Sequence, residues 1–178
     1  MRPGLLPALL TAAMLMIASA TSFAQVLDSV GKEARAYRQP SAQELAQYRL
    51  SAEQGIAEAQ VLLGHYYRLG IGVAQSNAEA LKWYRLAAEQ GNAEGQLMLG
   101  LFQVSGSGVA KNADEAAKWF LLSADQGNVE AQFMIGLYYA AGSGVAKNAD
   151  EAAKWFLLAA ERGKPEAQVQ LGKWYNAG

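Results

Sequence analysis

Apolar residues recur along most of the chain at the spacing of one face of a helix. Ala59, Leu63 and Tyr67 are four residues apart, which places them on the same side of an α-helix. A second run contains Trp83 and Ala87 at the same spacing, and glycine-rich sequence separates the two runs. The pattern predicts two amphipathic helices joined by a turn.

This two-helix pattern recurs every 36 residues, as the tryptophans Trp83, Trp119 and Trp155 show. Glycines keep the same step in three series: Gly55, Gly91, Gly127 and Gly163; Gly64, Gly100, Gly136 and Gly172; Gly70, Gly106, Gly142 and Gly178. Residues 106–122 and 142–158 are identical, which indicates a recent duplication. A fixed period of this length is typical of stacked repeats. The sequence therefore predicts an all-α fold, an α/α superhelix (solenoid) of 36-residue helix-turn-helix repeats.

Start and stop signals support these helices. Each predicted second helix begins with a small polar residue three positions before a glutamate, as in a capping box: Ser76 and Glu79, Asn112 and Glu115, Asn148 and Glu151. Gly70 and its copies follow the last apolar residue of each first helix, where glycine ends helices. Gly64 and its copies lie inside the first helices, where glycine costs about 1 kcal/mol relative to alanine. We expect a neighbouring helix to approach closely there.

The domain organisation follows from these signals. Ser41 and Glu44 mark the start of a lone second helix before the first complete repeat. The predicted segments are a signal peptide at 1–24, a linker or N-terminal cap at 25–40, a lone helix at 41–54, repeats at 55–90, 91–126 and 127–162, and a partial repeat at 163–178. This gives eight helices, or nine if residues 25–40 form one.

The N-terminus predicts export. Arg2 precedes an apolar run at residues 5–18, and Ser22-Phe23-Ala24 offers small residues before a cleavage point at Gln25. The alternative is an uncleaved anchor, but the run is short for a membrane span. We expect a periplasmic or secreted bacterial protein with no stable membrane insertion after cleavage.

Charge and residue usage exclude several kinds of chemistry. Lys and Arg number 15 against 16 Asp and Glu, so no strong positive field attracts nucleic acid. The chain has no cysteine and one histidine, His65, so we expect no metal, no cofactor and no catalytic residues. Ser29 and Lys32 have the spacing of an acyl-transfer pair, but no second catalytic motif follows.

The repeat resembles a known family. The residues that carry the resemblance are Ala57-Glu58-Ala59-Gln60, Leu63-Gly64, Tyr67, Gly70-Ile71-Gly72-Val73, Glu79-Ala80, Trp83-Tyr84 and Ala87-Ala88-Glu89-Gln90-Gly91. This pattern resembles the Sel-one-like repeat, a relative of the tetratricopeptide repeat, over almost all of residues 41–178. Gln103 departs from it, since tyrosine stands at the equivalent positions, and we expect poorer packing there.

The resemblance implies a right-handed superhelix whose first helices line a concave surface, in proteins that act as adaptors and scaffolds. We therefore expect an exported, non-enzymatic protein that binds a protein or peptide partner. Some exported members are cross-linked by disulfides and linked to penicillin binding, and a cell-wall or β-lactam-acting enzyme is the competing hypothesis. Because this chain has no cysteine, that activity does not carry over residue by residue. Self-association is a third possibility, and the oligomeric state stays undetermined.

The partner-specific residues are expected on the concave face of the first helices. They are Val61, His65, Arg68, Leu97, Leu101, Val104, Phe133, Leu137, Val169 and Lys173. An exposed apolar patch of this kind marks interaction sites. The alternative is that a tightly wound superhelix buries Leu97, Leu101 and Phe133 as core. A periodic aromatic ladder is expected to fill space between hairpins: Tyr66, Phe102, Tyr138 and Trp174.

Overall fold

The computed structural model describes residues 38–175, with the side chains as far as residue 173. Within this part of the chain every regular element is a helix, so the predicted all-α solenoid is confirmed. The helices are α3 Ala42–Glu53, α4 Ala57–Leu69, α5 Asn77–Glu89, α6 Ala93–Ser105, α7 Ala113–Asp125, α8 Val129–Ala141, α9 Ala149–Glu161 and α10 Pro165–Tyr175. The predicted signal peptide, the greater part of the predicted cap at 25–40, and Ser29 and Lys32 lie outside the described residues.

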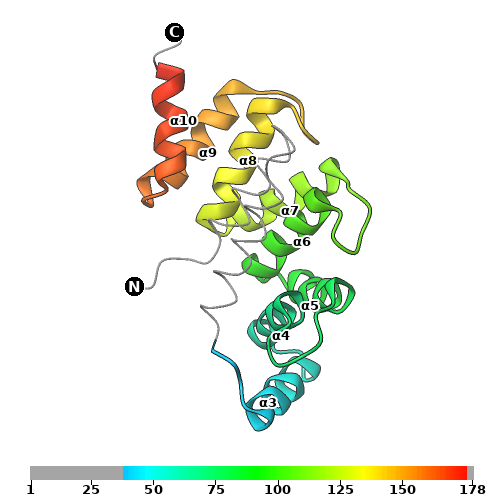
Figure 1. Cartoon of the computed structure of the whole chain (residues 1–178). Helices are drawn as coiled ribbons and strands as arrows, with labels where there is room; N and C mark the ends of the chain where they lie inside the picture. The colour runs from blue at the N-terminus through cyan, green and yellow to red at the C-terminus, as the bar shows by residue number, and fades with distance from the viewer. Residues whose placement is uncertain (1–37, 176–178) are drawn as a thin grey trace.

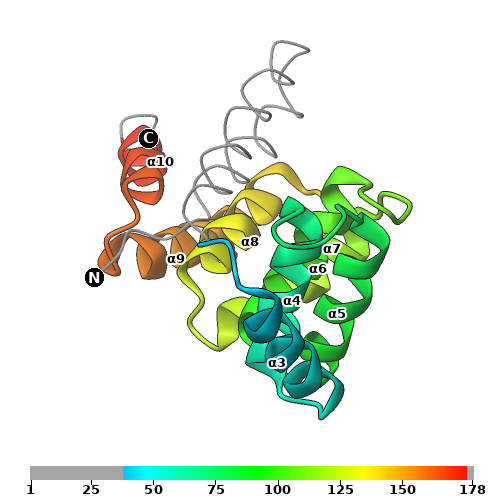
Figure 2. The same ribbon diagram turned by 60° about the horizontal axis from the view of Figure 1, so that its bottom comes forward.

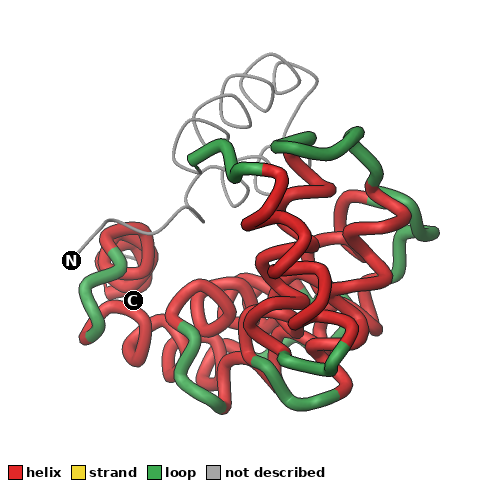
Figure 3. Tube along the Cα trace, turned by 90° about the horizontal axis from the view of Figure 1, so that it is seen from below, coloured by secondary structure: helices red, strands yellow, loops and turns green. Residues whose placement is uncertain are grey.

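Consecutive helices pack side by side in chain order, from α3 at one end to α10 at the other (Figure 1). The first helices are α4, α6, α8 and α10, and the second helices are α3, α5, α7 and α9. Each helix contacts the next in sequence, and α4 also touches α6 across the intervening α5. The stack curves as it proceeds, as Figures 2 and 3 show from two further directions. Such a stack buries a continuous core that no single hairpin could form.

Glycine ends three of the first helices as expected. The C-caps Gly70, Gly106 and Gly142 have φ of 69°, 75° and 73°, in the left-handed region that favours glycine. Their amides bond to carbonyl oxygens of the last helical turn. This conformation turns the chain towards the following second helix.

The predicted N-caps of the second helices are present, although the full reciprocal box is formed at only one described helix. The side chains of Ser76, Asn112 and Asn148 each accept a hydrogen bond from the amide three residues later. Glu115 and Glu151 instead pair with lysines three residues further along. The expectation that these acids return to the cap backbone is therefore wrong for α7 and α9.

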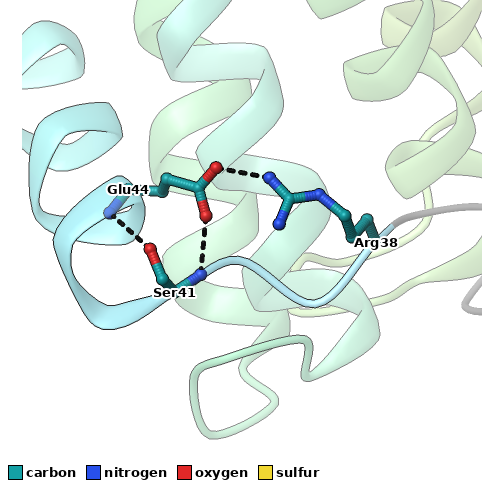
Figure 4. A network of polar contacts seen from close by, with 3 residues as sticks. All are labelled: Arg38, Ser41 and Glu44. Carbon is teal, nitrogen blue, oxygen red and sulfur yellow. Dashed lines mark hydrogen bonds and ion pairs between the residues drawn. The ribbon is translucent and has the colours of Figure 1, made fainter.

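The full capping box is found at the start of α3 (Figure 4). The amide of Glu44 donates to Ser41 Oγ at 3.2 Å, and the amide of Ser41 donates to Glu44 Oε2 at 2.8 Å. The Arg38 guanidinium pairs with the other carboxylate oxygen. These hydrogen bonds, chiefly the one from the Ser41 amide, lower the pKa of Glu44 to about 2.

The helical glycines accept aromatic rings from the second helices, as the predicted close approach required. A Cβ built on Gly64 would lie 2.5 Å from a ring carbon of Tyr84. Gly100 has the same relation to Phe120 at 2.5 Å, and Gly136 to Phe156 at 2.8 Å. All three rings are almost completely buried. The glycines therefore set how closely the two helices of each hairpin can pack.

The aromatic ladder lies between consecutive hairpins, and its role as space-filling core is confirmed for the described side chains. Phe102 packs edge-on against Tyr84 with ring centroids 5.5 Å apart, and Tyr138 does the same against Phe120 at 5.3 Å. Burial raises the pKa of Tyr138 to about 12. The Trp174 side chain lies outside the described part of the structure.

Candidate protein-binding surface

Most of the residues predicted to contact a partner are buried in the stack. The buried members are Val61, His65, Arg68, Leu97, Leu101 and Phe133. Leu97 and Phe133 have relative exposures of 0%, and Leu101 has 5%. The expectation of an exposed apolar patch in the middle of the first-helix face is therefore wrong, and the core alternative describes these three residues.

The physical reason is the tight nesting of one hairpin on the next. Val61, Leu97, Phe133 and Val169 occupy the same place in successive repeats, but only Val169 is exposed, at 56%. No described hairpin follows α10, so no described helix covers its outer side. Lys173 on the same helix is also exposed, while Val104 and Leu137 are half-buried. The accessible members of the predicted set therefore gather towards the C-terminal half of the array.

His65 joins three helices through a buried hydrogen-bond network. Its Nδ1 lies 2.9 Å from the Tyr84 hydroxyl on α5, and its Nε2 lies 2.9 Å from Glu94 Oε1 on α6. The hydrogen bond to His65 is the main cause that holds the pKa of Glu94 below its ordinary value. Because leucine and phenylalanine replace the histidine and tyrosine one repeat later, this network links only the first two hairpins among the described residues.

A second polar link connects α10 to the preceding repeat. Lys164 Nζ lies 2.7 Å from Glu130 Oε1, with the lysine side chain only 5% exposed. The same ammonium lies 5.6 Å from the ring centroid of Phe133 and 3.4 Å from Glu166. Burial raises the pKa of Glu130 even though Lys164 opposes the shift. The arrangement is an ion pair between repeats, with the cation held over an aromatic face.

Glutamines form a ladder that ties each first helix to the second helix before it. The buried amide Nε2 of Gln60 donates to Ala52 O at 3.0 Å, that of Gln96 to Ala88 O at 3.4 Å, and that of Gln132 to Ala124 O at 3.2 Å. These bonds satisfy carbonyls at the ends of the second helices. The period of these glutamines was visible in the sequence, but their polar character gave no sign that they are buried.

We call each buried glutamine and its hydrogen-bond partners one rung of the ladder. In each of the first two rungs, a second glutamine donates a hydrogen bond to the side-chain oxygen of the buried one. Gln90 Nε2 donates to Gln60 Oε1 at 2.7 Å, and Gln126 Nε2 donates to Gln96 Oε1 at 2.7 Å. The next position in this series is Arg162, whose Nη1 donates instead to Gly127 O at 2.5 Å. Gln132 Oε1 is consequently buried without a hydrogen-bond partner.

A pocket of about 330 Å³ lies where the ladder is interrupted. The lining residues come from the end of α7 and the turn after it, from α8, and from α9 and its C-cap: Ala124, Asp125, Gln126, Gly127, Gln132, Trp155, Leu158 and Arg162. Trp155 is 6% exposed, and its indole Nε1 is also buried without a partner. The sequence analysis did not identify this pocket, although the replacement of glutamine by arginine at one periodic position was a signal that could have found it.

The second helices carry exposed leucines that the sequence analysis also missed. Leu50, Leu86 and Leu122 occupy equivalent positions and are 48%, 37% and 47% exposed, and Leu157 on α9 is 50% exposed. Singly exposed apolar residues are common on protein surfaces and need no special role.

Gln103 replaces the tyrosine of the other repeats, and the poorer packing expected there stays a prediction. Its side-chain Oε1 is buried and lacks a hydrogen-bond partner. A buried acceptor without a donor costs about 1–3 kcal/mol. The tyrosine that occupies this place in the preceding repeat, Tyr67, has its hydroxyl 3.4 Å from Arg49 instead.

Between residues 38 and 175 no three His, Cys, Asp or Glu side chains come together in a metal-binding group. In the same part of the chain, none of the helices combines the length and the apolar character that crossing a bilayer requires.

Comparison with known proteins places this architecture in context. Residues 57–92, 93–128, 129–164 and 165–178 match the Sel1 repeat. The crystal structure of a Sel1 repeat protein from Oxalobacter formigenes is 36% identical, has a TM-score of 0.70, and aligns over 74% of this chain and 99% of that chain. A comparison with curated proteins gave no match.

Two further solved structures are similar. One is c5321, a protective antigen present in uropathogenic Escherichia coli strains displaying an SLR fold, with 30% identity and a TM-score of 0.73. The match covers 94% of this chain but only 40% of that chain. The other is Helicobacter pylori cysteine rich protein B, with 22% identity, a TM-score of 0.57, and coverage of 71% and 96%. At that identity the last similarity concerns the fold alone.

Proposed function

This chain belongs to the Sel1 repeat family, and we propose that it is an exported scaffold or adaptor that binds a protein or peptide partner on its first-helix face. Sel1 repeat proteins are in general protein-interaction scaffolds and typically not enzymes. The observation that carries the proposal is the curved stack of four matched repeats, in which accessible apolar side chains remain on the first helices. Stacked helical repeats characteristically bind partners along such extended surfaces.

The proposed contact residues are the accessible members of the predicted set: Val104, Leu137, Val169 and Lys173. They lie on α6, α8 and α10. Substitution of the buried members would remove core packing and confound any binding result. The contacts should therefore be tested at the accessible positions alone.

A pull-down from the envelope fraction tests the binding. Wild-type protein should retain a specific partner, identified by mass spectrometry and rebound after separate purification. Val169→Glu should weaken that purified complex about ten-fold or more, because a charge replaces an apolar contact, and Lys173→Glu should weaken it because the charge at this exposed position is reversed. Leu86→Glu is the matched control, since it adds the same charge to an exposed leucine on a second helix. Circular dichroism confirms that each variant remains helical. Undiminished binding by both variants would refute the assignment of this face.

Export is a separate part of the proposal and has its own test. The leader at residues 1–24 supports a cleaved signal, whose removal takes away Arg2 and exposes Gln25 as the new N-terminus. We expect N-terminal sequencing of protein from the periplasm or the medium to begin at Gln25. A chain that keeps Met1 and sediments with membranes would show the uncleaved anchor instead.

A further inference from the structure

In the third rung of the glutamine ladder, the side-chain amide of Gln132 donates a hydrogen bond but its oxygen accepts none. Gln132 is 3% exposed, and its Nε2 is fixed by donation to Ala124 O at 3.2 Å. Its orientation is therefore set, and Oε1 faces the ladder as an acceptor only. One repeat earlier, the same acceptor on Gln96 receives Gln126 Nε2 at 2.7 Å. The third rung has the same geometry but no donor.

Arg162 does not close this rung although it carries several donors. Its Nη1 is engaged by Gly127 O at 2.5 Å, on the exposed side of the loop after α7. Gln132 Oε1 remains without a partner beside the pocket that Arg162 borders. The Trp155 indole Nε1 also lacks a partner, as does the equivalent Trp83 indole in the first hairpin, where Gln90 closes the rung, so Gln132 Oε1 is the atom that distinguishes this site. A buried polar group without a partner is unfavourable, so a ligand that supplies the missing hydrogen bond is bound more tightly than one that does not.

The pocket can hold more than a bridging water. Its volume is about 330 Å³, whereas one water occupies about 30 Å³. Leu158 gives it an apolar wall, and its polar groups include an unpaired acceptor on Gln132, donors on Trp155 and Arg162, and the side chains of Asp125 and Gln126. A carboxylate has no N–H for Gln132, and a purely apolar group satisfies neither side. A primary carboxamide offers both an N–H and a C=O.

We propose that this pocket binds the side-chain carboxamide of a glutamine from a partner protein, in the place that Gln126 takes one repeat earlier. The ligand amide donates to Gln132 Oε1, and its oxygen accepts from Trp155 or Arg162. Entry requires the exposed Arg162 side chain to leave Gly127 O. The site is formed by Gln132 on α8 together with the end of α7 and with α9, and it contains none of the proposed contact residues on the first helices, so the two proposals are tested independently.

The test follows the Trp155 indole N–H of the full chain by NMR, with its signal assigned through Trp155→Phe. The probes are the N-acetyl methylamides of glutamine, glutamate and norleucine at millimolar concentrations. We expect a saturable shift of the Trp155 signal with the glutamine probe, and at least about ten-fold weaker binding of the other two. Equal binding of the glutamate probe, or no saturable shift with any probe, would overturn the proposal.

Two substitutions of Arg162 distinguish whether binding depends on the missing hydrogen-bond donor to Gln132 or on the charge of the arginine. Arg162→Gln restores the third rung from within the chain and should abolish the response, whereas Arg162→Ala leaves the pocket open and should retain it within about three-fold. Conversely, Gln126→Arg should create a second responsive pocket, reported by the Trp119 indole. A response that survives Arg162→Gln would refute the inference. Sedimentation is a second check. If the protein self-associates with increasing concentration and only Arg162→Gln abolishes this, the pocket binds a second copy of this chain and the inference is refuted.

Discussion

Replacing Gly100 by alanine tests whether the ring that fills this position really determines the packing of a hairpin. The added methyl group would lie 2.5 Å from Phe120 Cε1 and 2.6 Å from Cδ1, well inside van der Waals contact. Phe120 is completely buried and packs edge-on against Tyr138, so the ring has little room to move. The two helices must separate, or the ring must leave its preferred rotamer.

Two opposing effects set the magnitude. Alanine is a better helix former than glycine by about 1 kcal/mol, whereas overpacking a filled core costs about 1–3 kcal/mol. We expect Gly100→Ala to destabilise the protein by about 1 kcal/mol net. The matched control is Gly172→Ala, at the same place in the repeat but with no atom within 4 Å of the new methyl. It should stabilise the protein by up to about 1 kcal/mol.

Urea denaturation followed by circular dichroism measures both changes as shifts of the unfolding midpoint. The midpoint should fall for Gly100→Ala and rise for Gly172→Ala. In a Phe120→Leu background, the smaller side chain should reduce the cost of Gly100→Ala, which a double-mutant cycle detects as coupling. The reasoning would be refuted if both glycine substitutions raised the midpoint equally, because propensity alone would then explain them.

Three further outcomes follow from the polar contacts. Asn148→Ala should lower the free energy of unfolding by about 1 kcal/mol, since the start of α9 loses its 3.1 Å cap bond; an unchanged midpoint would show that solvent replaces the cap. Glu94→Gln should destabilise the protein at pH 7 by less than about 1 kcal/mol because Glu94 is 47% exposed. Its folded-state pKa is lowered, so the difference from wild type should vanish as acid protonates Glu94; a difference constant with pH would contradict this. The side-chain carboxyl carbon of Glu44 should titrate by NMR near pH 2, and a midpoint near 4.5 would mean that the capping box does not persist in solution.

The fold was accessible to sequence analysis because the determining signals are local and repeated. Helical spacing, N-cap residues and glycine stops each depend on a few neighbouring positions, and three or four copies of each removed the ambiguity of a single match. The close approach at Gly64 and its copies was also predictable, since a costly residue inside a helix requires a packing reason. The identity of the ring that fills the space required the structure.

The candidate surface was less predictable because burial in a solenoid depends on how tightly successive hairpins nest. The spacing of Leu97 and Phe133 alone could not show that both are completely buried. Phe133, for example, packs against Phe156 of its own hairpin and beneath Lys164, and only the structure gives these contacts. The periodic glutamines show the opposite difference: polar residues are usually exposed, yet these side chains are buried. Their role depends on carbonyls contributed by another helix, such as Ala124 O for Gln132.

The space beside Gly172 has a consequence for engineering longer arrays. A methyl group at Gly172 would meet no neighbouring element within 4 Å, so α10 has free space at the position where an aromatic ring packs in each earlier hairpin. Because Gly178 already occupies the place of Gly142, a copy of residues 143–162 appended after it would supply the connecting turn, the helix and the matching phenylalanine in register. The length of such a rod is therefore adjustable by adding whole modules, without redesigning any contact that already exists.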